Sequence, residues 1–106
     1  MRHRMHDLVT LSRTEKVLDE RKRVSRVDHP SRELRACIRS VQSKYERKEP
    51  VEWEFLAELA FRLKEDVKLG DYLKLPGYED DFFVVVARPA RHYLRVQAIM
   101  RQRGAS

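Results

Sequence analysis

Three arginines recur at a spacing that would place them on one ridge of a helix. Arg32, Arg35 and Arg39 stand at positions i, i+3 and i+7 within the segment 31–47, and such positions share one face of an α-helix. Guanidinium groups bind phosphate oxygens through paired hydrogen bonds and can read purine edges in the DNA major groove. The ridge therefore predicts a nucleic-acid-binding face of the helix-turn-helix type. A solvated basic face is the alternative.

A second arginine-rich segment lies near the C-terminus. Arg88, Arg91 and Arg95 occur beside His92 and Tyr93, and residues 82–106 carry 5 basic and no acidic side chains. Arginine interleaved with an aromatic residue suits RNA, through phosphate contact and base stacking. We therefore add these three arginines to the predicted nucleic-acid-binding residues, with DNA and RNA both left open.

The charge is distributed in three blocks. The chain has 23 Lys+Arg and 17 Asp+Glu, for a net charge of +6. Residues 1–50 and 82–106 are basic, whereas residues 51–81 hold 4 basic and 9 acidic side chains. A polyanion should approach the outer blocks. Alternatively, the blocks neutralise one another within the fold, or the acidic middle binds other polypeptides.

Motifs for enzymatic chemistry are missing from the sequence. It has no glycine-rich phosphate loop ending in Lys-Ser/Thr, no H-E-x-x-H and no G-x-S-x-G. His3 and His6 could be two metal ligands but lack a nearby third, and the carboxylates of Asp71 and 79–81 lack calcium-loop spacing. We predict a protein that is not an enzyme, with no catalytic residue, metal or cofactor.

Length and composition limit the class of protein. A chain of 106 residues has the length of a single domain. The single cysteine, Cys37, excludes an intrachain disulfide framework. The longest apolar run, 82–87, is too short for a membrane span, and the N-terminus lacks the apolar stretch of a secretory signal. We predict a cytoplasmic protein that binds no membrane. Mitochondrial import is the alternative, because Arg2, Arg4 and Arg13 accompany few acids.

The first two thirds of the chain predict three helices. Ser12-Arg13-Thr14-Glu15 matches a capping box, which predicts a helix over 13–26 with a thin apolar stripe. Apolar residues recur every three or four positions over 31–47, which predicts the second helix. A broad apolar arc between Pro50 and Gly70 predicts the third.

The periodicity changes after Gly70. Tyr72–Leu75 alternates, Pro76-Gly77 suits a type II turn, and Phe82–Ala87 is rich in β-branched and aromatic residues, so we predict a β-hairpin. The stretch from His92 to Met100 fits either a strand or a helix, and its residue types favour the helix.

Together these elements predict an α+β fold: three helices followed by a β-hairpin and a short C-terminal helix or strand. Residues 1–12 are expected to be a flexible basic N-terminus, and 13–106 a single compact domain in which 13–28 is a candidate peripheral helical arm.

One local stretch is similar to a known family. Gly70-Asp71-Tyr72, the strand over 82–87, Arg88 and Arg91-His92-Tyr93 resemble the C-terminal half of the bacterial toxin endonucleases that cut messenger RNA on the ribosome. The resemblance implies arginine, histidine and tyrosine acting on a 2′-hydroxyl and a phosphate. That family opens with a strand, whereas residues 1–28 predict none.

The sequence thus predicts a small basic, non-enzymatic protein that binds nucleic acid, either helix-turn-helix-like or RNA-binding. The alternative is an interaction or assembly subunit of a larger protein complex, with a homodimer among the possibilities. A ribosome-dependent endonuclease is the third hypothesis.

Overall fold

The computed structural model describes residues 5–18, 20–46 and 52–103, and across these residues every regular element is a β-strand. The α+β prediction is therefore wrong. In chain order the strands are β1 (Asp7–Ser12), β2 (Thr14–Leu18), β3 (Val24–Asp28), β4 (Arg32–Glu46), β5 (Glu52–Phe61), β6 (Tyr72–Lys74), β7 (Phe82–Pro89) and β8 (Leu94–Arg103).

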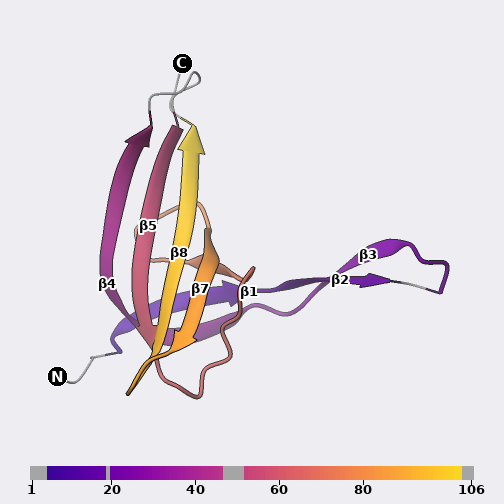
Figure 1. The fold of residues 1–106 in the computed structure, drawn as a ribbon, viewed down its shortest axis with the longest axis horizontal. Helices are drawn as coiled ribbons and strands as arrows, with labels where there is room; N and C mark the ends of the chain where they lie inside the picture. The colour runs from indigo at the N-terminus through magenta and orange to yellow at the C-terminus, as the bar shows by residue number, and fades with distance from the viewer. Residues whose placement is uncertain (1–4, 19, 47–51, 104–106) are drawn as a thin grey trace.

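Six of these strands close into a barrel. Their order is β1-β4-β5-β8-β7-β6, and β6 pairs back onto β1 to complete the circle. Strands β4, β5 and β8 are the longest, and they continue beyond the barrel as a three-stranded blade (Figure 1). Closure leaves no free sheet edge around the barrel itself.

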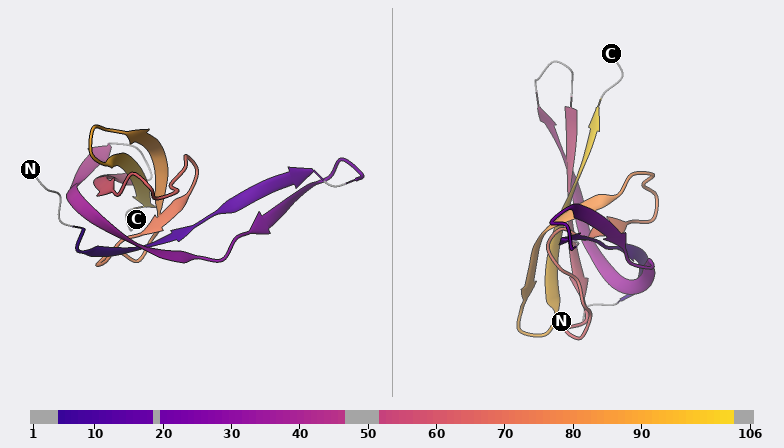
Figure 2. Two further views of the ribbon diagram at one scale, coloured as in Figure 1. Left: turned by 90° about the horizontal axis from the view of Figure 1, so that it is seen from below. Right: turned by 90° about the vertical axis from the view of Figure 1, so that its right-hand side faces the viewer.

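Strands β2 and β3 form a separate two-stranded sheet, which we call the arm (residues 14–28). The arm projects away from the barrel in Figure 1 and in the left view of Figure 2. The radius of gyration, 15.7 Å, exceeds the roughly 13 Å expected for a compact chain of this length. The helix predicted over 13–26 is wrong, because this segment is a β-ribbon.

Alternation along the barrel strands builds the core. In β5, Ala57, Leu59 and Phe61 are buried inside the barrel and alternate with the partly exposed Leu56 and Glu58 on the outer side, where the small Ala60 is also buried. This period of two is the signature of a strand with one face buried. The segment 50–70, predicted as a helix, thus contains β5 and a loop. The largest fully buried side chains are Phe61, Phe82, Leu11, Leu59, Leu73, Leu75, Val9, Val84 and Val96.

A β-bulge explains why the helix predicted over 31–47 is wrong. The register of β4 against β5 shifts between Ile38 and Ser40. Before the bulge, even-numbered residues such as Leu34 face the core, and after it the odd-numbered Val41 does. An extra residue in a strand changes which positions face inward. The result is an apolar spacing of four and three, which mimics a helix.

The C-terminal segment is strand β8, so the favoured helix over 92–100 is wrong and the strand alternative is right. Every second residue from Leu94 to Met100 is buried, as alternation requires. β8 lies between β5 and β7 and pairs antiparallel with both.

The predicted hairpin is confirmed. β6 and β7 pair antiparallel, and the Tyr78 N–H donates to the Leu75 carbonyl (3.3 Å) across Pro76-Gly77. Gly77 has φ 85°, which a type II turn requires at its third position. The Tyr78 ring packs edge-on against Phe82, with ring centroids 5.3 Å apart, so the turn is tied to the core.

Part of the segment 1–12, predicted as a flexible terminus, is strand β1. Its Val9 and Leu11 are buried in the core at 0% and 2% exposure. The described residues include no helix of the length and apolarity that crossing a membrane would need.

Candidate interaction surfaces

The arm carries large apolar side chains that nothing in the described chain covers. Every described residue of β2 and β3 is exposed. Leu18 and Val24 are 68% and 64% exposed, and Val17 and Val27 are 41% and 44% exposed. A lone two-stranded ribbon is marginally stable in water, so these side chains are the first candidates for contact with another polypeptide.

The register of the arm sorts its residues onto two faces. Leu18 lies directly opposite Val24, and Lys16 lies opposite Arg26. Directly opposed residues share one face of an antiparallel pair, and so do residues two apart on a strand. One face of the arm therefore presents an apolar pair near its tip and a basic pair closer to the barrel.

An ion-pair cluster fixes the base of the arm. Arg13, between β1 and β2, donates from Nε and Nη2 to the two carboxylate oxygens of Asp71, both at 2.9 Å. Its Nη1 donates to Asp66 Oδ2 at 2.9 Å. Asp71 is 2% exposed and also accepts the Lys68 N–H at 2.8 Å. Hydrogen bonds to Asp71 and then Asp66 raise the pKa of Arg13 above its usual range.

A transverse row of apolar side chains crosses the outside of the barrel. Tyr72 on β6 pairs with Phe83 on β7, Phe83 with Ile99 on β8, and Ile99 with Leu56 on β5. We call these four residues the outer row. Tyr72 and Phe83 are 41% and 40% exposed, and their ring centroids lie 5.4 Å apart. Cross-strand neighbours on one face form a continuous surface.

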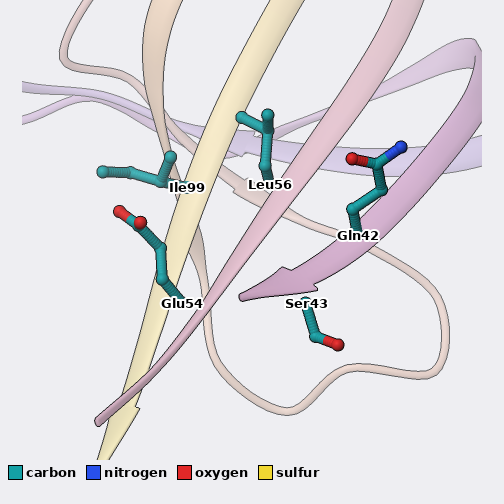
Figure 3. A pocket seen from close by; sticks show the side chains of 5 residues that line it. All are labelled: Gln42, Ser43, Glu54, Leu56 and Ile99. Carbon is teal, nitrogen blue, oxygen red and sulfur yellow. The ribbon is translucent and has the colours of Figure 1, made fainter. Parts of the chain in front are cut away.

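One end of the outer row opens into a hollow of about 420 Å³. Leu56 and Ile99 lie on neighbouring strands there, with Glu54 beside Ile99 and Gln42 on the far side of Leu56 (Figure 3). The fifth lining residue, Ser43, points away from Gln42 (Figure 3). The hollow has an apolar floor with polar rims, which suits an inserted apolar side chain.

Polar side chains separate the outer row from the rest of the sheet. Glu58 Oε1 accepts hydrogen bonds from Gln97 (2.7 Å) and Arg95 (3.2 Å). These bonds, Gln97 first, lower the pKa of the Glu58 carboxyl below its ordinary value. On the opposite side of the row, Glu54 pairs with Arg101 at 3.6 Å. Carboxylates thus flank the outer row on both sides.

Five of the six predicted nucleic-acid-binding arginines lie near one end of the sheet. Arg88 pairs directly with Arg95, and each faces outward because the neighbouring Ala87–Val96 pair faces the barrel interior. Arg35 and Arg39 lie on the outer side of β4, and Arg91 lies in the turn between β7 and β8. All five are exposed. We call them the arginine patch.

Two arginines of the patch are held in place by neighbours. Arg39 Nη1 donates to the Tyr93 hydroxyl at 3.2 Å, and its guanidinium lies 5.9 Å from the Tyr93 ring centroid. Arg95 pairs with Glu58, and its side chain remains 53% exposed. The patch therefore has ordered guanidinium groups with open faces.

The prediction that Arg32, Arg35 and Arg39 form one ridge of a helix is wrong. Arg32 pairs with Leu11, whose side chain is buried, whereas Arg35 pairs with the exposed Leu8. Arg32 and Arg35 thus point to opposite sides of β4, and Arg32 donates to the Asp66 carbonyl at 2.8 Å instead. A strand separates side chains three apart, which a helix would bring together. The helix-turn-helix version of nucleic-acid binding is not retained.

Sequence reasoning missed the arm and the outer row. Val17, Leu18 and Val24 fit a thin helical stripe, whereas in the structure the chain turns at Lys22, with φ 57°, and these residues lie on the paired strands of a hairpin. The outer row joins residues from four strands, and only the register brings them together. Of the two histidines considered as metal ligands, His3 lies outside the described residues.

Comparison with known proteins adds a likeness in fold. No family model matches the chain, and no curated protein matches it. Among solved structures the chain is similar to the phage-like element PBSX protein xkdH from Bacillus subtilis. The TM-score is 0.61 with 13% sequence identity, over 88% of this chain and 91% of that chain. At this identity the likeness shows the fold alone.

Proposed function

We propose that this protein is an assembly subunit whose arm binds the outer row of a second copy of the same chain. The observation that carries the proposal is the arm itself, a projecting ribbon with Leu18 and Val24 on one face at 68% and 64% exposure. Burying a large apolar side chain contributes roughly 1.5–3 kcal/mol. In an isolated chain these side chains stay in contact with water, so the stabilisation from burying them is not gained.

The dimensions of the two surfaces agree. The outer row crosses three strand spacings, or about 14 Å, and each five-residue strand of the arm is about 17 Å long. The arm projects away from its own barrel (Figures 1 and 2), so the outer row that it contacts belongs to another copy.

The charges also agree. Lys16 and Arg26 lie on the arm face that presents Leu18 and Val24, and Glu54 and Glu58 flank the outer row, where each already pairs with an arginine of β8. Opposite charges around an apolar centre favour one orientation of the two partners. The likeness in fold to xkdH, a protein of a phage-like element, is compatible with an assembly role.

Paired variants test the contact by sedimentation velocity. Leu18→Thr/Val24→Thr removes the apolar pair of the arm, and Tyr72→Thr/Phe83→Thr weakens the outer row; threonine keeps the preference for strands. Each variant alone should be monomeric. An equimolar mixture should form a 1:1 complex, because each variant retains the surface that the other lacks.

Leu8→Thr/Leu63→Thr is the matched control, because both leucines are exposed apolar residues outside the arm and the outer row. This control should associate like the unmodified chain. A monomeric unmodified chain at high concentration would overturn the proposal, and so would failure of the folded mixture to associate.

A further inference from the structure

The arginine patch is a second surface, and the arm does not account for it. Arg88 and Arg95 lie directly opposite each other on adjacent strands. Like charges in this position destabilise a sheet. Arg91 follows in the adjoining turn, and Arg35 and Arg39 extend the patch across β4.

Few carboxylates lie among these arginines. Glu58 pairs with Arg95, and Glu33 lies two residues from Arg35 on the same strand. The acidic residues of the 76–81 loop precede β7, and Arg88 lies near the other end of that strand. Internal neutralisation therefore leaves most of the patch's charge facing outward.

We propose that the arginine patch binds the phosphodiester backbone of a nucleic acid. Guanidinium groups match phosphate oxygens through paired hydrogen bonds. The patch spans β4, β5, β8 and β7, which is about 14 Å of sheet, enough to contact several phosphates. Tyr93 is the aromatic ring held within the patch, and it lies against Arg39. The patch is therefore suited to backbone contact without sequence readout.

This site can act together with the contact between arm and outer row. The row of Gln97 and Glu58 separates Ile99 and Leu56 of the outer row from Arg95 of the patch. Association of copies through the outer row would leave the patch open, so the two proposals stand or fall separately.

Fluorescence polarisation with labelled strands of about 20 nucleotides tests the proposal. The probes are duplex DNA, duplex RNA and the single strands, each at several salt concentrations between about 50 and 200 mM. If the four arginines other than the carboxylate-paired Arg95 each contact a phosphate, log K for duplex DNA should fall against log salt with a slope of about −3.6, and for a single strand with a slope of about −2.8. Affinity for duplex DNA would then fall about 150-fold over this range. The probe bound most tightly assigns the ligand as DNA or RNA.

Arg88→Gln/Arg91→Gln should lower the slope to about −1.8, so that affinity falls only about 12-fold over the same range. The matched control is Lys74→Gln/Arg101→Gln, which removes the same charge outside the patch. Arg101 lies six residues along β8 from Arg95, or about 20 Å. This control should keep the unmodified slope. Arg35→Gln/Arg91→Gln provides a second test if the first variant fails to fold.

Absence of binding at 50 mM salt overturns the proposal. An equal loss of nucleic-acid affinity in the patch variant and in the control also overturns the proposal, because net charge alone would then explain binding. Equally tight binding of polyglutamate would replace the nucleic acid with an acidic polypeptide. If the RNA probes were recovered cleaved after incubation with the protein, a role limited to binding would be overturned.

Discussion

Arg13 and Asp71, 58 residues apart in sequence, form a bidentate pair with two 2.9 Å hydrogen bonds where the arm leaves the barrel. The Asp71 side chain is 3% exposed and that of Arg13 is 17% exposed. This pair connects the arm to the loop between β5 and β6, and it fixes the direction in which the arm projects.

Arg13→Ala should destabilise the protein by about 3 kcal/mol, because removing one partner leaves a buried carboxylate without its counter-charge. Urea denaturation gives the free energy of unfolding. Arg32→Ala is the control: Arg32 also binds Asp66, but through an exposed bond to its carbonyl, and its loss should cost about 1 kcal/mol or less. Equal costs for the two variants would contradict the assigned role of the pair.

Stability should fall on acidification. Hydrogen bonding to Arg13 lowers the pKa of Asp66, and bonding to Gln97 and Arg95 lowers that of Glu58. The unfolded chain therefore binds more protons near the ordinary carboxyl values, about pH 4. The stabilisation is complete above this range and is lost as pH falls through the lowered values.

Urea midpoints measured from pH 3 to pH 7 (roughly the range in which carboxyls titrate) would show this slope. Asp66→Asn/Glu58→Gln should flatten it. Glu79→Gln, in the exposed 76–81 loop, is the control and should leave the slope as it is. An unchanged slope in the double variant would disprove the assignment.

Shortening the arm should leave the barrel folded. The His29 N–H donates to the Arg13 carbonyl at 2.9 Å, and the Thr14 hydroxyl bonds to Asp28 at 3.0 Å, so the base is already closed. Residues 15–27 can be replaced by Asn-Gly, which suits a two-residue hairpin. The free energy of unfolding should change by about 0.5 kcal/mol or less, while self-association disappears. Loss of the folded barrel would show that the arm is part of its core.

Neighbouring leucines in β5 should behave differently. Leu59 is 1% exposed inside the barrel, so Leu59→Ala should cost about 2–5 kcal/mol. Leu56 lies in the outer row and is partly exposed, so Leu56→Ala should cost clearly less but weaken self-association. Thermal denaturation and sedimentation measure the two effects. Equal losses of stability would be at odds with the alternation of β5.

The sequence could predict elements whose signals are local. The Pro76-Gly77 turn and the strands beside it form a hairpin because the turn geometry depends on those residues alone. The helix over 31–47 was wrong because the bulge after Ile38 changes the parity of the apolar positions. The helix over 50–70 was wrong because outward residues such as Leu56 are apolar too, which hides the period of two.

The candidate surfaces also differ in how far the sequence could predict them. Arg88, Arg91 and Arg95 lie close together because a tight turn joins β7 and β8, and their proximity was visible in the sequence. Arg35 joins them only through the pairing of β4, β5 and β8, which no local pattern specifies. The opposite orientation of Arg32 follows from the same register.

The arm and the outer row are different surfaces of one chain. In the proposed contact, two copies would either exchange arms across a two-fold axis, or join head-to-tail and leave one copy of each surface unused. A head-to-tail interface is satisfied fully only when successive rotations return to the first subunit and close a ring; otherwise it propagates as a filament. In the proposed assembly, the angle at which Arg13 and Asp71 hold the arm would decide which of these arrangements forms and how many copies complete a ring.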